Sequence, residues 1–376
     1  MWVKEVRLAD FRSYHEVEVA LEPGVTTFLG ENGQGKTNLI EAIGYASVLS
    51  SHRVATDAPL VRIGAERAVI GIDIVKDDRS TLIELELNPG RANRARLNRS
   101  PVPRPRELVG LIRTVLFAPE DLALVKGDPS DRRRFIDDLL VQLTPRMQGV
   151  KADYDRILKQ RNALLKSGTH GGEHIASTLE IWDEQLADTG AELIAARVGL
   201  LESVKPRLAL AYERIAGGAD AVSSAVADVG YQSSLGPDVE ISTDRDTWRT
   251  QLLAGIDRRR REERARGLTL VGPQRDDLVL RLAGSPAKSF ASHGESWSIA
   301  LALRFAALDV LQEEGDDPVL ILDDVFAELD AARRGRLTDR VAGSTQVLIT
   351  AAVGEDVPEA LSGRRMRVAA GQVRDD

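Results

Sequence analysis

The chain has 376 residues, of which 43% are hydrophobic and 29% are charged, and its formal net charge is −8 at pH 7. The length predicts two or three domains, and no apolar run approaches the ~20 residues that a bilayer-spanning helix needs. Cysteine is absent, which excludes disulfides and thiolate metal sites and favours a cytoplasmic protein, while the acidic balance restricts any nucleic-acid binding to local basic patches.

The first 120 residues are predicted to be rich in β-strands. Polar and apolar residues alternate in three segments, which is typical of half-buried antiparallel strands: YHEVEVAL (14–21), VIGIDIV (69–75) and LIELEL (82–87). Three other segments are apolar on both faces, as in the central strands of a covered parallel sheet: VTTFLG (25–30), PVLILDD (318–324) and TQVLITAA (345–352).

The middle of the chain has a helical pattern. Helices are expected at 130–143, with Ser130 as the N-cap, at 145–167, at 175–215, and through 257–266, while 217–230 reads as a loop and 278–282 as a strand. We therefore expect a nucleotide-binding domain split by a helical insertion. The expected divisions are 1–127 for its first half, 128–266 for a helical arm and 267–376 for its second half.

A phosphate-binding loop follows the predicted strand at 25–29 and precedes a predicted helix. Its glycines allow backbone N–H groups to surround phosphates, Lys36 would reach the terminal phosphates of ATP, and the Thr37 hydroxyl would bind Mg²⁺. The loop consists of Gly30, Glu31, Asn32, Gly33, Gln34, Gly35, Lys36 and Thr37.

The second motif is acidic and lies in PVLILDDVFAELD, residues 318–330. The apolar strand ends in Asp323 and Asp324, which is the Walker B arrangement. Asp323 would hold Mg²⁺ and Asp324 could polarise the attacking water. The alternative is a strand that simply ends in an acidic turn.

A third element, ASHGESWSIALALRFAAL (291–308), begins a predicted helix at Ser292. Serine at this position is either an ordinary N-cap or part of a second phosphate-binding helix terminus. Since one ATP is already served by the phosphate loop, a second anion site would require a second ATP or a second chain.

The order of these three elements resembles the ABC-type ATPases of chromosome maintenance and repair. Within that class the chain resembles the RecF family, through "DFRSY", "SSHR", "LFAPEDLALVKGDPSDRRRFID", "LVGPQRDDL" and "SHGESWSIALALRFA" in addition to the motifs above. The resemblance implies an α/β ABC-type P-loop ATPase head, with a mixed sheet and an antiparallel N-terminal subdomain, interrupted by a helical arm.

The resemblance also implies residue roles. Ser292 and Gly294 of one head would bind the γ-phosphate of ATP held by another head, Asp330 would cross the dimer interface, and Arg12 would contact the nucleotide. The expected catalytic set is Lys36, Ser292, Glu295, Asp323 and Asp324, and the expected metal ligands are Thr37, Asp323 and Glu120.

Four positions depart from the pattern of the class. After Gly294 the chain has Glu295, Ser296 and Trp297, where many relatives have Gln and Arg. Asp324 replaces a longer glutamate, and Glu120 stands in place of a glutamine. Thr350 stands where transporters of the wider class keep a histidine. The resemblance implies slow ATP hydrolysis, which the shorter carboxylate of Asp324 suits.

Arginine-rich segments are the candidates for DNA contact, although each could also be a solvated charged face. Residues 91–106 contain six arginines and no acid, whereas 257–266 contain six arginines and three acids at helical ion-pair spacing. Arg53 resembles an arginine that relatives use near DNA. The candidates are Arg53, Arg94, Arg96, Arg99, Arg132, Arg133 and Arg134.

These expectations together describe an ATP- and Mg²⁺-dependent clamp. The resemblance implies a homodimer on gapped DNA that helps to load RecA with RecR and RecO, and no membrane partner. Two alternatives remain: an architectural chromosome-maintenance ATPase, against which the short arm argues, and a P-loop kinase for a small molecule, which would need no signature helix.

Overall fold

The chain divides into two compact units in the computed structural model, which describes residues 1–167, 173–216, 226–315 and 317–376. The first, here called the head unit, contains Met1–Leu122, Leu210–Ser223 and Ser292–Asp376, and the second, here called the arm unit, contains Ala123–Ala209 and Ser224–Ala291. No helix in the described ranges combines the length and apolarity that a membrane crossing requires.

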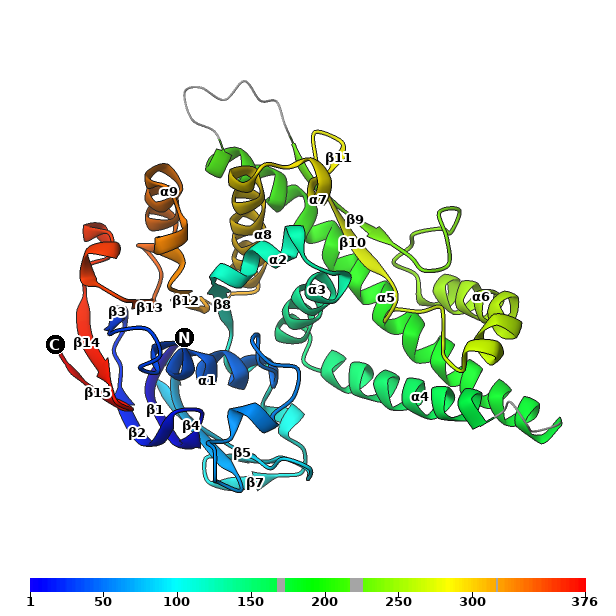
Figure 1. Cartoon of the computed structure of the whole chain (residues 1–376), viewed down its shortest axis with the longest axis horizontal. Helices are drawn as coiled ribbons and strands as arrows, with labels where there is room; N and C mark the ends of the chain where they lie inside the picture. Colours follow the sequence, from blue (N-terminus) through cyan, green and yellow to red (C-terminus); the bar gives the residue numbers. More distant parts are fainter. Residues whose placement is uncertain (168–172, 217–225, 316) are drawn as a thin grey trace. The chain divides into compact units, whose positions relative to one another are not determined.

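The described part of the head unit contains two six-stranded sheets together with α-helices (Figure 1). Its strands are β1 (Trp2–Phe11), β2 (Tyr14–Ala20), β3 (Gly24–Leu29), β4 (Ala68–Lys76), β5 (Arg79–Leu87), β6 (Arg94–Leu97), β7 (Ser100–Val102), β8 (Thr114–Phe117), β12 (Val319–Asp323), β13 (Gln346–Ala351), β14 (Arg364–Ala369) and β15 (Gln372–Asp375). Its helices are α1 (Lys36–Val48), α8 (His293–Glu313) and α9 (Ala331–Val341).

The first sheet of the head unit is antiparallel, in the order β2-β1-β4-β5-β6-β7. Ile70, Ile72 and Ile74 are buried on one face of β4, and Ile83, Leu85 and Leu87 are buried on β5. The predicted alternation is therefore confirmed, because each apolar set faces the core.

The second sheet has the order β15-β14-β3-β13-β12-β8, in which all neighbours are parallel except β14 and β15. Every residue of β12 and β13 is buried. This confirms the predicted parallel strands and brings the carboxyl ends of β3 and β12 to the same edge, on either side of β13.

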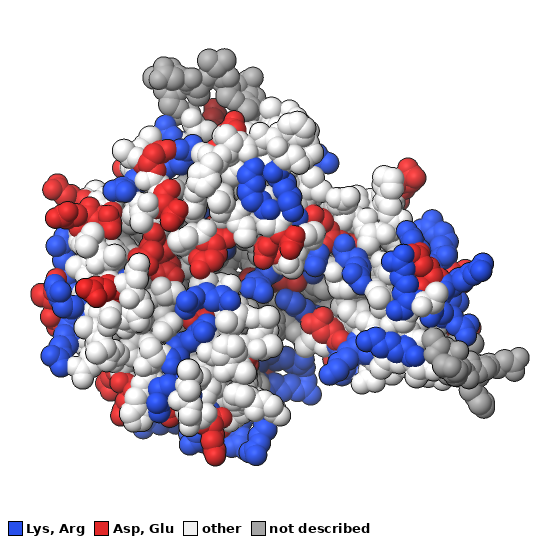
Figure 2. Space-filling view, in the orientation of Figure 1, with Lys and Arg blue, Asp and Glu red and all other residues white. Residues whose placement is uncertain are grey.

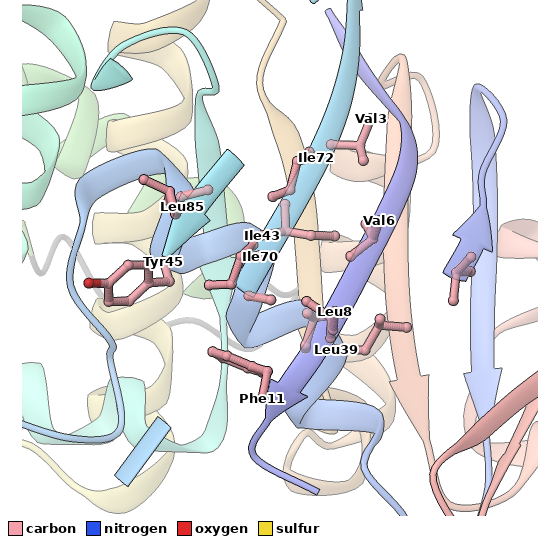
Figure 3. Packing of buried hydrophobic residues seen from close by; sticks show 14 of the residues in the cluster. Val3, Val6, Leu8, Phe11, Leu39, Ile43, Tyr45, Ile70, Ile72 and Leu85 are labelled. Atoms are coloured by element: carbon pink, nitrogen blue, oxygen red, sulfur yellow. The ribbon is translucent and has the colours of Figure 1, made fainter. Parts of the chain in front are cut away.

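Helix α1 shares one hydrophobic core with both sheets. Leu39 and Ile43 of α1 pack among Val6 and Leu8 of β1 and Ile70 of β4 (Figure 3). The same cluster contains Phe28, Ile321 and Leu348 from the parallel sheet. The helix that follows the phosphate loop is thus fixed by apolar contacts on both sides, which holds the loop in place.

The arm unit is mainly helical and also contains a three-stranded sheet, β11-β10-β9. Its elements are α3 (Pro129–Leu143), α4 (Met147–Ser167), most of α5 (Glu173–Ala216), α6 (Arg245–Arg266), α7 (Ala287–Phe290), β9 (Ala227–Gln232), β10 (Asp277–Leu282) and β11 (Ser285–Pro286). A short helix, α2 (Leu122–Lys126), lies at the division between the units.

Three sequence expectations differ from the observed arm unit. Asp128, and not Ser130, is the N-cap of α3, where it forms a capping box with Asp131. The end of the expected loop at 217–230 is strand β9, which pairs with β10; residues 217–225 lie outside the described ranges. Because β9 and β10 form one sheet, residues 267–291 pack with the arm unit rather than with the second half of the head.

A buried ion network joins three helices of the arm unit. Arg161 on α4 is fully buried and donates to Asp183 at 2.7 Å, to Glu263 at 2.6 Å and to the Thr269 hydroxyl at 2.8 Å. Burial opposes its charge, but the hydrogen bond to Glu263 and the charge of Asp183 outweigh that cost and raise the pKa of Arg161. The network therefore ties α4, α5 and α6 together through one guanidinium.

Candidate nucleotide site

The phosphate loop has the backbone geometry that its glycines allow. Gly33 and Gly35 have φ values of 83° and 113°, in the left-handed region that favours glycine. Gly30 is required for a different reason, since a Cβ there would lie 2.3 Å from the Val368 carbonyl oxygen of β14. The loop is closed by Tyr14, whose hydroxyl donates to the Gly35 carbonyl at 3.0 Å.

Lys36 and Thr37 begin α1 and face the ends of the neighbouring strands. The Lys36 ammonium is almost fully buried and donates to the carbonyls of Gly30, at 2.7 Å, and Glu31, at 3.2 Å. The Thr37 hydroxyl donates to Asp323 Oδ1 at 3.0 Å. The structure therefore brings the phosphate loop and the predicted Walker B carboxylate together across 286 residues of sequence.

Asp323 lies in a buried polar cluster at the end of β12. Burial raises its pKa to about 6, hydrogen bonds from Thr350 and Thr37 oppose this shift, and the charges of Asp324 and Glu120 add to it. The Glu120 charge thus acts on the same carboxylate that the sequence assigned to the metal. Asp324 follows with φ 47°, in the left-handed region, which is uncommon for a residue other than glycine.

Thr350 fixes both carboxylate residues. Its hydroxyl donates to Asp323 Oδ1 at 2.6 Å and accepts the Asp324 backbone N–H at 3.0 Å. Thr350 is buried at the end of β13, the strand between β3 and β12. It therefore takes a positioning role at the place where transporters of the wider class have a histidine.

The Thr37 hydroxyl and the Asp323 carboxylate form a donor set that suits Mg²⁺. This ion usually takes one or two protein oxygens and completes its shell with water and phosphate oxygens. Within the described ranges, no group of three or more His, Cys, Asp or Glu side chains is arranged to hold a metal by itself. The residues present thus fit a metal that is shared with a nucleotide.

A buried carboxylate, Glu41, joins the α1 helix to two loops. Its side chain is fully buried and accepts from Arg12 at 2.9 and 2.6 Å, from Ser51 at 2.5 Å and from Arg53 at 3.3 Å. Burial alone would raise the pKa of Glu41, but the hydrogen bonds from Arg12 and Ser51 and the charges of both arginines hold it below its usual value. Arg12 and Arg53, which the sequence assigned to nucleotide and DNA, therefore share one carboxylate.

The signature helix α8 begins with a capping box. The Ser292 hydroxyl accepts the Glu295 N–H at 3.3 Å, and the Glu295 carboxylate accepts the Ser292 N–H at 2.8 Å. The prediction that Ser292 is an N-cap is thus confirmed. This role is compatible with phosphate binding, because a hydroxyl that accepts one hydrogen bond can still donate its proton to a phosphate oxygen. For Glu295, the contact shows a structural role at the helix start.

Asp330 is the N-cap of α9. Its carboxylate accepts the Arg333 N–H at 2.8 Å and also pairs with the Arg333 guanidinium. Half of the Asp330 side chain is exposed. The predicted interface role of Asp330 therefore stays a prediction, with the carboxylate held in a fixed orientation.

The arginines of β6 are less available for DNA than their sequence suggested. Arg94 and Arg96 are exposed, but they lie directly opposite Glu86 and Glu84 of β5. Opposite charges across a strand pair offset each other. Figure 2 shows the same mixture of acidic and basic side chains over the visible face. Arg99, in the turn after β6, is exposed without a cross-strand acid in register.

The three arginines of α3 differ from one another. Arg132 is buried, pairs with Asp277 at 2.8 Å and donates to two backbone carbonyls, so it has a structural role, and its contact with DNA stays a prediction. Arg133 donates to the Asp276 carbonyl at 2.8 Å. Arg133 and Arg134 are partly exposed and remain candidates.

Glu41, Thr350 and Arg333 were not assigned a role from the sequence. Glu41 carried a signal, because it is a lone acid in the apolar stretch LIEAIGYA of α1. The sequence did not indicate the positioning roles of Thr350 and Arg333, because these roles depend on contacts with residues distant in the chain or on another helix.

Comparison with known proteins shows the family to which the chain is similar. A family model described as the RecF/RecN/SMC N terminal domain matches residues 2–372. The proteins described as DNA replication and repair protein RecF from Streptomyces avermitilis and Kineococcus radiotolerans are 55% and 54% identical, over 99% and 100% of both chains.

Solved structures give the same result. The structure of the recombination mediator protein RecF with ATPrS in the RecFOR pathway superposes with a TM-score of 0.88 and 28% identity, covering 100% of this chain and 98% of that one. The Smc head domain of Pyrococcus furiosus has a TM-score of 0.53 at 17% identity over 99% of this chain and 95% of that one, which supports the fold alone.

Proposed function

Since the chain belongs to the RecF family of DNA replication and repair proteins, we propose that it is an ATP-dependent DNA clamp of recombinational repair. In this proposal ATP joins two copies into a dimer that holds gapped DNA, and slow hydrolysis releases the DNA. RecR and RecO, which complete the RecFOR pathway named for the similar structures, would be partners in loading RecA, in the cytoplasm.

The observation that supports this proposal is that the head unit has two features suited to bind phosphate, the glycine-rich loop and the start of α8, with separate contacts. The phosphate loop contacts Asp323 and Tyr14, whereas the signature helix contacts Arg333, which in turn pairs with Asp330. One nucleotide uses the first feature. The second is supplied to a nucleotide held by another copy, which makes the site complete only in the dimer.

The residues have distinct tasks in this site. Lys36 would transfer its ammonium from the loop carbonyls to the terminal phosphates, and Thr37 and Asp323 would hold Mg²⁺, which neutralises phosphate charge. Asp324 would orient the attacking water. Ser292 of the second copy would donate to the γ-phosphate, and Arg12 would remain anchored on Glu41 while it faces the nucleotide.

Replacing Ser292 by arginine tests the shared site. We expect Ser292→Arg to bind ATP with the affinity of the wild type, because the phosphate loop is unchanged, but to form no dimer in sedimentation with a non-hydrolysable ATP analogue. Ser362→Arg, at an exposed serine of the same unit, is the control and should dimerise normally. A wild-type protein that stays monomeric with the analogue would refute the proposal, and unchanged turnover in Ser292→Arg would favour a kinase.

The preference for DNA structure separates the clamp from an architectural ATPase. We expect gapped duplexes to compete better than blunt duplexes for the ATP-bound protein. Equal competition by both would favour the architectural function.

Thr350→Val should weaken the metal-dependent step. Valine keeps the shape but removes the hydroxyl that fixes Asp323 and Asp324, and loss of such a supporting group typically costs about 10- to 100-fold in metal affinity or activity. The measurement is the Mg²⁺ dependence of ATP hydrolysis and of ATP binding. Thr350→Ser, which retains the hydroxyl, should stay close to wild type; equal losses in both variants would contradict the assigned role.

A further inference from the structure

Arg333 links the signature helix α8 to the turn that carries Asp330. Its Nε donates to Ser298 Oγ on α8 at 2.9 Å, and its guanidinium also pairs with the Asp330 carboxylate. Ser298 is fully buried, and the Arg333 side chain is 22% exposed. One guanidinium thus contacts both elements that would face a second copy.

The guanidinium of Arg333 also lies against the first turn of α8. A Cβ at Gly294 would be 2.9 Å from Arg333 Nη2 and 3.3 Å from its Cζ. Glycine in a helix is unfavourable by roughly 1 kcal/mol relative to alanine. Close approach of Arg333 gives a physical reason for a glycine at this position, because any larger residue would displace the guanidinium.

Two charged side chains at the start of α8 and of α9, Glu295 and Arg333, both lie close enough to act on Tyr212. The charges of Glu295 and Arg333 act in opposite directions on the Tyr212 hydroxyl, whose pKa is raised mainly by burial. Asp330 is half exposed, and its carboxylate accepts the Arg333 backbone N–H, pairs with the Arg333 guanidinium and interacts with the Ala332 backbone N–H. Removal of the Arg333 side chain would therefore leave only backbone N–H groups of the helix start to orient that carboxylate.

We infer that Arg333 is a positioning residue of the shared nucleotide site, which fixes Ser292 and Asp330 relative to each other before a second copy binds. This inference rests on the proposed ATP-dependent dimer. Its physical basis is preorganisation: a turn that is already ordered loses less conformational entropy when the dimer forms. Arg333 acts through Asp330 and the α8 backbone, and no direct contact with the nucleotide is required.

The test compares Arg333→Ala with Arg340→Ala. Arg340 lies on the same helix and pairs with Asp309 of α8, so its removal also breaks an α8–α9 ion pair, but far along the helix from Ser292. We expect Arg333→Ala to weaken the dimer formed with a non-hydrolysable ATP analogue by about tenfold or more, while Arg340→Ala dimerises like the wild type. Both variants should bind ATP as monomers with unchanged affinity and should melt at similar temperatures.

Arg333→Lys separates charge from geometry. Lysine keeps the positive charge but cannot donate to Ser298 and Asp330 in the planar arrangement of a guanidinium. We therefore expect Arg333→Lys to dimerise as poorly as Arg333→Ala. Normal dimerisation of either Arg333 variant, or an equal defect in Arg340→Ala, would overturn the inference.

A mixing experiment shows which nucleotide Arg333 serves. A Lys36→Ala chain mixed with an Arg333→Ala chain would form heterodimers with one intact site, made from the phosphate loop of one chain and Arg333 of the other. We expect the mixture to hydrolyse ATP faster than either variant alone. If Arg333 served the nucleotide of its own chain, the mixture would show no gain. A wild-type protein that does not dimerise with ATP would instead refute the shared site itself.

Discussion

Replacing Arg161 by leucine should lower the free energy of unfolding of the arm unit by about 3–5 kcal/mol, the usual cost of breaking a buried ion pair by removing one partner. The change leaves Asp183 and Glu263 buried without the guanidinium that neutralises both. Asp183 retains Arg260 at 3.1 Å, and Glu263 retains the Leu270 N–H at 2.7 Å, so Glu263 is the carboxylate left without an ionic partner.

Hydrogen exchange of the backbone amides of α4 and α6 is the measurement for this variant, because it reports the opening of the arm unit separately from the head unit. Arg156→Leu is the matched control on the same helix, since its pair with Asp153 is exposed and should contribute less than about 1 kcal/mol. Equal protection of α4 in both variants would show that the buried network does not stabilise the arm unit.

The elements that the sequence predicted well are those whose signal is local. The phosphate loop lies between a buried strand and a helix, and its glycines, Lys36 and Thr37 are contiguous, so their arrangement follows from the order of residues. The alternation of polar and apolar residues in β4 and β5 likewise predicted which face of each strand is buried, because the apolar side chains must face the core.

The elements that the sequence did not predict depend on distant partners. Arg132 belongs to a basic run, but Asp277, 145 residues later, makes it a buried ion pair. Arg94 and Arg96 formed part of an acid-free stretch, yet the register of β5 and β6 sets glutamates opposite both. Strand β9 is short and exists because β10 supplies its ladder. A run of basic residues therefore does not by itself predict an arginine free of acidic partners, because pairing across the sheet or between helices supplies those partners.

Replacing Glu41 by glutamine should have the largest effect on the head unit, with a loss of about 3 kcal/mol in the free energy of unfolding. Glutamine has nearly the same shape but no charge, so Arg12 loses its bidentate partner and Arg53 loses its nearest carboxylate. ATP affinity should fall as well, because Arg12 would exchange two charged bonds for one to a neutral amide oxygen, beside its bond to the Pro59 carbonyl at 3.2 Å. Urea denaturation and calorimetric ATP titration measure the two effects.

Asp10→Asn is the control for Glu41→Gln, since Asp10 also pairs with an arginine near the β1–β2 turn but is partly exposed and should contribute less than about 1 kcal/mol. The sign of the pH dependence gives a second check. The pKa of Glu41 is lowered by folding, so its stabilising contribution is present above its ordinary value of 4.5 and is lost as the pH falls through the lower value of the folded state. The stability difference between wild type and Glu41→Gln should therefore be full at neutral pH and shrink on acidification. A difference that is independent of pH would mean that the shape of residue 41, and not its charge, holds the two arginines.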